Sequence, residues 1–260
     1  MPKGYVNYLF VFFLFSLYSC EKPINRSLIP ATCRQCILVL TDSAEDAKGF
    51  LYRFEKDGKK SSWRMIGKKT PVILGRNGLG WGRGIDHSSN PFNYPIKKEG
   101  DGRSPAGIFH LSLVFASKPK EQMRNLKMPY LHITEMTECV DDVNSEYYNQ
   151  VVSRDKIETE KVDWESSEKM SSYAPRYELG VVVEHNTHPV KKKCGSCIFL
   201  HNWSNPNETT SGCTAMDPAK MQEIVYWLDE DKQPVLIQLT QQSYIGLIKR
   251  WGLPEIINRR

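Results

Sequence analysis

Residues 197–216 constrain the folding of this chain more than any other stretch. They read CIFLHNWSNPNETTSGCTAM, so an apolar run ends in His201, a polar loop follows, and a Ser-Gly-Cys triplet occupies 211–213. An Asp-Pro pair at 217–218 then signals the start of a helix, with an N-cap residue followed by proline at the first helical position. The order predicts a strand, a loop and a helix that hold His201 and Cys213 close together.

The pair of His201 and Cys213 has the chemistry of a nucleophilic site. A thiol becomes reactive when a base within hydrogen-bond reach removes its proton, and imidazole can serve as that base. The oxyanion that forms on attack needs backbone N–H donors, and Gly212 beside Ser211 lets the amides near Cys213 converge. These residues predict acyl transfer through a thioester. The alternative is a buried thiol beside a packing histidine.

Two neighbouring features leave alternatives open. His185 and His188 follow a valine-rich run at 179–184. His185 is therefore either a second candidate base or a buried polar group at the edge of the site. No acidic residue stands at a spacing that would orient the imidazole of His201, so either Ser196 or a backbone carbonyl is expected to do so.

A second motif agrees with the first, and the two resemble those of a known family. Residues 99–109 read EGDGRSPAGIF, which is similar to the G-D-G-(K/R)-(S/T)-P-x-G-x-F signature of the YkuD-like L,D-transpeptidases. The F-L-H run at 199–201 and the Ser-Gly-Cys triplet resemble the active-site motif of that family. The two blocks stand in the family's order, and the resemblance covers residues 37–240.

The resemblance implies a reaction and a substrate. Members of the family attack peptidoglycan stem peptides between a diamino acid and the following D-alanine, release D-alanine, and pass the acyl group from the cysteine to an amine. For this chain it implies Cys213 as nucleophile and His201 as base, with no cofactor and no metal. Many members carry arginine two residues after the cysteine, where this chain has Ala215, as in a branch that reads G-C-x-A. Arg83 and Arg103 are the candidates for the missing contact with substrate.

Residues 135–168 differ in charge from the rest of the chain. They contain eleven acidic and three basic residues, whereas the whole chain has a net charge of +5. We predict an acidic insertion across one face of the domain, which acts as a lid or remains a solvated loop. Tyr147 and Tyr148 resemble a segment of the same family branch and are predicted to face the substrate.

The remaining patterns predict a mainly β fold. Strands are expected at 37–41, 50–54, 63–66, 71–74, 105–116, 179–184 and 234–240. Helices are expected at 217–229, with one apolar face, and at 243–251. With the resemblance, these elements predict an L,D-transpeptidase-like β-sandwich with one helix following the catalytic cysteine. The glycine-rich run 75–84 fits no nucleotide-binding spacing and is predicted to form a flexible wall beside the site.

The first residues are predicted to direct export. Lys3 precedes an apolar run at 9–17 that is too short to cross a bilayer, so residues 1–19 are predicted to be a signal peptide. The run ends at Cys20 in a sequence that resembles a bacterial lipoprotein cleavage box, so Cys20 is expected to carry a lipid anchor. Residues 20–36 are then a tether and 37–260 the catalytic domain. The expected location is the periplasm or cell envelope.

Cysteine usage leaves a choice between disulfides and zinc. Besides Cys20 and Cys213, the chain has Cys33, Cys36, Cys139, Cys194 and Cys197. Four of these form two C-x-x-C pairs. In an exported protein we expect disulfides between the two pairs, which would leave Cys139 over. One zinc ion held by the four sulfurs is the alternative.

Three functions follow from these observations. The first is an L,D-transpeptidase, with peptidoglycan stem peptides as partners. The second is an L,D-carboxypeptidase with the same chemistry and water as acceptor, and the third is a lipoprotein that binds cell wall without catalysis. Nucleic acid is not an expected partner, because the net charge is small and no binding motif is present.

Overall fold

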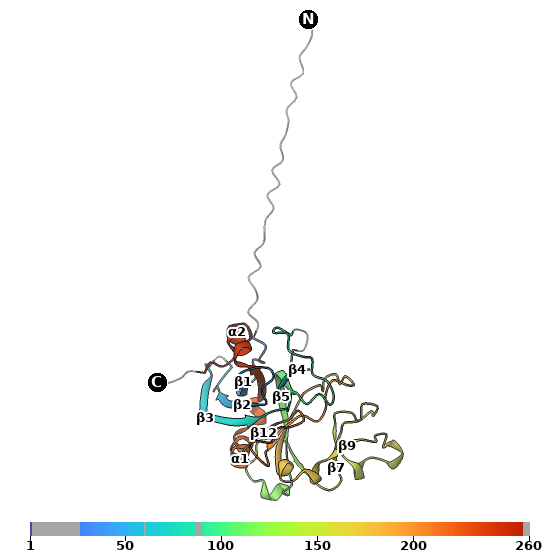
Figure 1. Ribbon diagram of the computed structural model, residues 1–260. Coiled ribbons are helices and arrows are strands. Elements are labelled where there is room, and N and C mark those ends of the chain that lie inside the picture. The colour runs from blue at the N-terminus through green and yellow to red at the C-terminus, as the bar shows by residue number, and fades with distance from the viewer. Residues whose placement is uncertain (2–26, 60, 87–89, 257–260) are drawn as a thin grey trace.

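The computed structural model describes residues 1, 27–59, 61–86 and 90–256 (Figure 1). The expected signal peptide, the expected lipidation site Cys20 and the first part of the expected tether lie outside these residues, apart from residue 1. Within the described part of the chain, no helix has both the length and the apolar character needed to cross a membrane.

One sheet of ten strands forms the body of the molecule. Its strands are β1 (Gln35–Thr41), β2 (Lys48–Glu55), β3 (Arg64–Ile73), β4 (Leu79–Trp81), β5 (Ser104–Ala116), β6 (Tyr130–His132), β10 (Leu179–Val183), β11 (Phe199–Asn202), β12 (Thr214–Met216) and β13 (Val235–Thr240). Their order is β10-β11-β12-β3-β2-β1-β13-β5-β4, with β6 beside β5. Because β10 pairs with β5 as well as with β11, the sheet closes on itself, which removes the open edges of both strands.

The expected mainly β fold is therefore confirmed, with a main sheet that is closed. Every residue of β1 and of β13 is buried. These two strands pair in parallel, and their near-continuous apolar sequences are typical of strands covered on both faces.

Two α-helices pack on this sheet. Helix α1 (Pro218–Trp227) follows Cys213, as expected, and the carboxylate of its N-cap residue Asp217 accepts a hydrogen bond from the Ala219 amide at 2.9 Å. Helix α2 (Gln241–Trp251) lies against β1 and β13. It ends at Gly252, whose φ of 65° is a left-handed conformation that favours glycine.

In the described part of the chain, six short 3-10 helices connect the other elements. They are η1 (Lys120–Gln122), η2 (Arg154–Lys156), η3 (Thr159–Lys161), η4 (Met170–Tyr173), η5 (Arg176–Glu178) and η6 (Glu230–Lys232).

The acidic segment folds into a sheet of its own. Strands β7 (Thr137–Val140), β8 (Val151–Ser153) and β9 (Ser167–Lys169) pair antiparallel in the order β8-β7-β9. Figure 1 shows this small sheet at the lower right, beside the main sheet. The buried carboxylate of Glu138 accepts hydrogen bonds from Arg154 at 2.6 Å, Trp164 at 3.0 Å and Ser167 at 2.6 Å. These bonds tie β7 to both flanking segments, which explains how so acidic a segment becomes ordered.

Three sequence-based expectations are corrected by the structure. The expected strands at 63–66 and 71–74 are one strand, β3, with a register shift opposite Leu51 and Arg53. The glycine-rich run 75–84 is closely packed rather than a flexible wall. A Cβ atom on Gly84 would lie 2.0 Å from the Ile108 carbonyl oxygen, so the close approach of two backbones requires glycine there.

The cysteine pairing also differs from the expectation. Cys139, expected to be left over, forms a disulfide with Cys197, while Cys33, Cys36, Cys194 and Cys213 are free. The proposed bridge between the two C-x-x-C pairs is therefore wrong, and Cys197 is no longer available as the fourth sulfur of a zinc site. Spacing alone favoured the pairs, but the fold brings β7 against the segment before β11. Within the described residues, no group of three or more His, Cys, Asp or Glu side chains could hold a metal ion.

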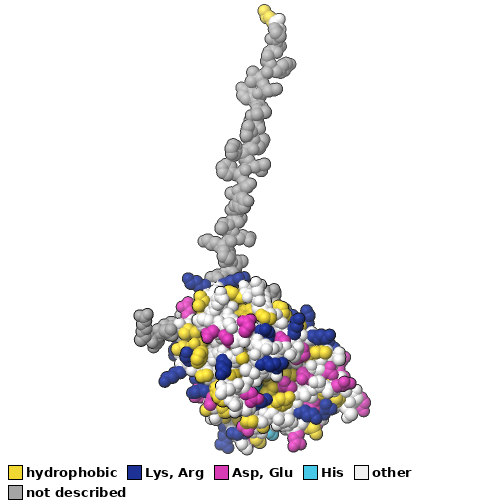
Figure 2. Space-filling view, viewed as in Figure 1, with side chains coloured by type: hydrophobic (Ala, Val, Ile, Leu, Met, Phe, Trp, Pro, Cys, Tyr) yellow, Lys and Arg dark blue, Asp and Glu magenta, His cyan; other side chains and the backbone are white. Residues whose placement is uncertain are grey.

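Charged side chains are interspersed on the surface. Figure 2 shows Lys and Arg among Asp and Glu over the face in view, rather than a broad area of one sign. This distribution agrees with the small net charge of +5.

Candidate active site

The Ser-Gly-Cys triplet and the second motif meet at the backbone of Cys213. The Ser104 hydroxyl, at the start of β5, donates to the Cys213 carbonyl at 3.0 Å, and the Thr210 hydroxyl donates to the same oxygen at 2.6 Å. Ser104 in turn accepts from the Gly75 amide at 2.9 Å. Two motifs that are 109 residues apart in sequence thus hold one peptide group in place.

The thiol of Cys213 is buried, and the residue directly precedes β12. Its sulfur accepts a hydrogen bond from the Phe199 amide at 3.3 Å and donates to the Cys197 carbonyl at 3.4 Å. Burial, followed by the negative charge of Glu168, raises the pKa of the Cys213 thiol to about 12, although the Phe199 amide and the Tyr177 hydroxyl act in the opposite direction. The thiol is therefore neutral at physiological pH in this structure.

His201 lies on β11 and is fixed by a backbone carbonyl. Its Nδ1 is 2.7 Å from the Asn202 carbonyl oxygen, which can only accept, so Nδ1 carries the proton and Nε2 is left as an acceptor. Burial lowers the pKa of His201 to about 4. Of the two expected orienting groups, the backbone carbonyl holds the ring, whereas the Ser196 hydroxyl donates to Glu99 at 2.8 Å.

Parallel pairing of β11 with β12 brings His201 and Cys213 into one cavity. His201 is the register partner of Ala215, two residues beyond the cysteine. Both side chains line a cavity of about 140 Å³. No hydrogen bond joins the imidazole to the thiol among the described residues. Such bonds are often long in the absence of substrate and tighten when it binds.

The same cavity contains side chains that sequence reasoning did not single out. Tyr177, in η5, packs its ring against the His201 ring at 5.2 Å, and its hydroxyl donates to the Glu168 carboxylate at 2.6 Å. Tyr173 stacks on Tyr177 with the ring centroids 5.0 Å apart. Arg176 also lines the cavity and forms an ion pair with Glu208. The local sequence around Glu168 and Tyr177 carries no motif that distinguishes them from other residues of their type.

The residues expected to shape the oxyanion site are close to Cys213. The Gly212 amide donates to the Thr210 hydroxyl at 3.2 Å. A Cβ atom on Gly212 would lie 3.1 Å from the Arg103 carbonyl oxygen, so the absence of a side chain allows the two motifs to approach. The Ser211 hydroxyl is 3.5 Å from the Arg76 guanidinium and lines the cavity.

The two arginines expected to bind substrate lie elsewhere. The Arg83 guanidinium donates to the Asn186 side chain at 3.1 Å and lines a different cavity, with His110 and Glu184. The Arg103 guanidinium donates to the Leu79 carbonyl at 2.9 Å. Neither side chain lines the cavity of Cys213, whereas Arg176 does.

The other three expected substrate-binding residues are held in internal contacts. His185 is buried, accepts from the Arg83 amide at Nδ1 over 3.2 Å and donates from Nε2 to the Cys194 carbonyl over 2.9 Å, so both its nitrogens are occupied. The Tyr148 hydroxyl donates to Glu99, and the Tyr147 ring packs on the edge of Trp164. None of the three lines the cavity of Cys213.

Comparison with known proteins identifies the family. The YkuD L,D-transpeptidase catalytic domain matches residues 44–237. No curated protein matches this chain. Among solved structures, the helical cell shape determining protein Pgp2 from Campylobacter jejuni has 14% sequence identity and a TM-score of 0.37, over 80% of this chain and 48% of that one, so this chain spans about half of its length. Because the match extends over most of the chain and includes both motifs at Cys213, the chain belongs to the YkuD family of L,D-transpeptidase catalytic domains.

Proposed function

We propose that this protein is an L,D-transpeptidase that acts on peptidoglycan stem peptides, with Cys213 as nucleophile and His201 as base. One observation supports the proposal most: His201 and the free thiol of Cys213 line a single cavity, with the Cys213 backbone held by Ser104 and Thr210. A cysteine that served only packing would not need a histidine with a free acceptor nitrogen beside it.

The chemistry follows from the protonation states. The Cys213 sulfur attacks the carbonyl carbon that precedes D-alanine, and His201 Nε2 takes the thiol proton. The C–N bond then breaks, the imidazolium returns the proton to the departing amine, and D-alanine leaves while the acyl group stays on sulfur as a thioester. An acceptor amine attacks the thioester to form a cross-link, which regenerates the thiol.

The acyl acceptor separates a transpeptidase from an L,D-carboxypeptidase. The carboxypeptidase uses water in the second step, and a binding protein without catalysis would form no thioester. Products formed with and without an added acceptor amine distinguish the first two functions. Trapping of Cys213 by a carbapenem separates both from the third.

The small sheet of β7, β8 and β9 is, in this proposal, an insertion that covers the site, because Glu168 on β9 lines the cavity of Cys213. Peptidoglycan lies outside the cytoplasm, so the proposed function also requires export, with a lipid on Cys20 as the anchor. Labelling with a fatty-acid probe tests the anchor. The label is expected on the wild type and should be absent from a Cys20→Ala variant; an unlabelled wild type would exclude it.

Turnover of a stem tetrapeptide tests the catalytic assignment. We expect Cys213→Ala to release no D-alanine, and His201→Ala to lower kcat/KM by a factor of about 10² to 10⁴, the usual contribution of a general base. Cys194→Ser, which removes a free but partly exposed thiol, is the matched control and should keep wild-type turnover. Full activity in Cys213→Ala would refute the assignment.

A further inference from the structure

The cavity beside Cys213 contains a carboxyl group without a basic partner. Glu168 accepts a hydrogen bond from the Tyr177 hydroxyl at 2.6 Å, and the other charged groups that act on it are the carboxylates of Asp141 and Glu99. Among the described residues, no salt bridge includes Glu168. A partly buried carboxylate whose charge is raised in energy by other carboxylates, and that has no salt bridge, costs free energy. Its position in a cavity suggests that a ligand supplies the missing positive charge.

The second carboxylate in the cavity differs in this respect. Glu208 forms an ion pair with Arg176, which also donates to the Ser204 hydroxyl at 3.2 Å. The charge of Glu208 is therefore already offset by the protein, and its side chain is 49% exposed. Of the two carboxylates among the described residues that line this cavity, Glu168 is the one that forms no ion pair.

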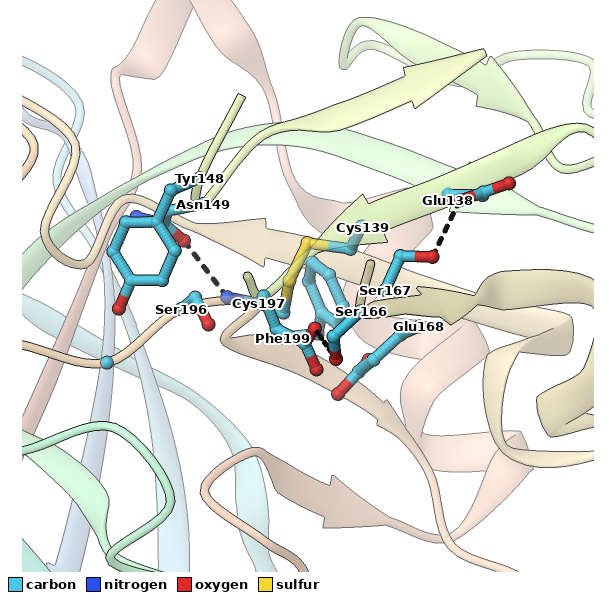
Figure 3. The surroundings of a disulfide bond; sticks show 12 residues. Glu138, Cys139, Tyr148, Asn149, Ser166, Ser167, Glu168, Ser196, Cys197 and Phe199 are labelled. Atoms are coloured by element: carbon cyan, nitrogen blue, oxygen red, sulfur yellow. Dashed lines mark hydrogen bonds between the residues drawn. A yellow bond between two sulfur atoms is a disulfide. The ribbon is translucent and has the colours of Figure 1, made fainter. Parts of the chain in front are cut away.

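Glu168 is fixed relative to the thiol by the disulfide. On the small sheet, Glu168 of β9 is the register partner of Cys139 of β7, and Cys139 is bonded to Cys197 (Figure 3). The Cys197 carbonyl accepts the hydrogen bond of the Cys213 thiol at 3.4 Å. The Tyr177 hydroxyl makes a second link, because it donates to Glu168 and also lowers the pKa of the Cys213 thiol. The carboxylate is thus part of a rigid arrangement around the nucleophile.

We propose that Glu168 binds the ammonium group of a cationic substrate side chain beside the bond that Cys213 attacks. This inference rests on the proposed function and deepens it. The substrate stays the stem peptide of the proposed function, and the new assignment is the protein group that binds the side-chain amine of its diamino acid. Glu168 is then a specificity-determining residue, and Tyr177 holds its carboxylate in position.

The electrostatics of the site agree with this role. Burial, with the charges of Asp141 and Glu99, raises the pKa of Glu168 to about 7, while the Tyr177 hydrogen bond opposes the rise. A bound ammonium would favour the charged carboxylate. It would also offset the negative charge that helps to keep the Cys213 thiol protonated. A substrate whose side chain carries an ammonium group would therefore make the Cys213 thiol easier to ionise.

Binding to an inactive variant tests the proposal without turnover. The probes are the tetrapeptide L-Ala-γ-D-Glu-L-Lys-D-Ala and its Nε-acetyl-lysine form, which differ by one charge. On Cys213→Ala at pH 8, calorimetry should give a Kd about tenfold lower for the lysine peptide than for the acetyl-lysine peptide. Adding Glu168→Gln, which keeps an acceptor for Tyr177, should reduce the ratio of these two Kd values to about one. Glu208→Gln is the matched control and should leave the ratio unchanged.

Lowering the pH provides a second measurement that needs no substitution at Glu168. The ratio of the two Kd values should fall toward one as the pH drops below about 7, because Glu168 takes up a proton while the lysine of the peptide stays charged. Equal binding of both peptides at pH 8, or a ratio that survives Glu168→Gln, would overturn the proposal. Failure of the proposed function is a different result: wild-type Cys213 would then acquire no acyl group from either peptide, whatever their affinities.

Discussion

Neighbouring groups shift the pKa of the Cys213 thiol in opposite directions. Burial and the charge of Glu168 raise its pKa to about 12, while the Phe199 amide and the Tyr177 hydroxyl lower it. His201, whose pKa is lowered to about 4 by burial, is neutral as well. The site therefore contains a thiol and an imidazole rather than a thiolate–imidazolium pair, so in the proposed reaction proton transfer accompanies attack.

Substitutions at the two side-chain neighbours should shift the thiol pKa in opposite directions. We expect Glu168→Gln to lower it, because a nearby negative charge is removed, and Tyr177→Phe to raise it, because a hydroxyl that lowers the thiol pKa is removed. The measurement is the rate of iodoacetamide modification of Cys213 against pH, followed by peptide mapping in a Cys194→Ser background. Shifts of the same sign for both variants would contradict this account of the thiol.

Glu168 should also make stability depend on pH. Its folded-state pKa of about 7 lies above the ordinary 4.5, so the folded state retains a proton that the unfolded state loses, and stability falls as pH rises from about 4.5 to 7. The cost at pH 8 is roughly 3 kcal/mol at 1.36 kcal/mol per pKa unit. Glu168→Gln should therefore stabilise the protein in urea unfolding at pH 8 and have little effect at pH 4. Equal effects at the two pH values would contradict the raised pKa.

The sequence predicted His201 and Cys213 as a pair, but it did not predict the side chains that surround them. His201 and Cys213 stand in a motif whose order along the chain matches their order in space. Glu168 is one of eleven acidic residues between 135 and 168, and nothing in its local sequence marks it. Its position beside Tyr177 results from the packing of η5 against β11 and from the hydrogen bond between Tyr177 and Glu168, which are tertiary contacts that local patterns do not encode.

The stability of the small sheet of β7, β8 and β9 depends on the disulfide between Cys139 and Cys197. Its strands have three or four residues each, and three such strands bury little apolar surface. The disulfide joins β7 to the segment before β11 across 58 residues of sequence. In the chain-entropy model, closing a loop of that length stabilises the folded state by about 4 kcal/mol.

Reduction should therefore loosen this sheet. We expect a reductant, or the double substitution Cys139→Ala and Cys197→Ala, to lower the Tm by roughly 10 °C and to speed amide hydrogen exchange in 137–169. Calorimetry and exchange mass spectrometry measure the two effects. Cys194→Ser, a control that leaves the bridge intact, should keep both the wild-type Tm and its sensitivity to reductant. A wild-type Tm that does not respond to the reductant would contradict the role of the disulfide.

Elements with a clear apolar pattern were predictable, and those held by polar contacts were not. β1, β5, β10, β13 and α1 all fall where the sequence predicted them. The strands of the small sheet escaped prediction because β7 owes its order to hydrogen bonds on the buried Glu138 rather than to alternating apolar residues. β12 was missed because its three residues are too few to form a pattern.

At the scale of the whole molecule, closure of the main sheet is what brings the two motifs together. β5 begins with Ser104, which anchors the Cys213 carbonyl, and β5 also pairs with β10, the neighbour of the strand that carries His201. The mainly β class could be inferred from the sequence. The pairing of β10 with β5 could not, because it joins residues more than sixty positions apart without a local signal.

The proposed function requires a thioester between Cys213 and a peptidoglycan stem peptide, and intact-mass spectrometry of the protein incubated with a stem tetrapeptide detects it. We expect a mass increase equal to the acyl group of the peptide after loss of D-alanine, mapped to Cys213 and absent in Cys213→Ala. Release of D-alanine by the Cys213→Ala variant, or an acyl group mapped to another cysteine, would contradict it.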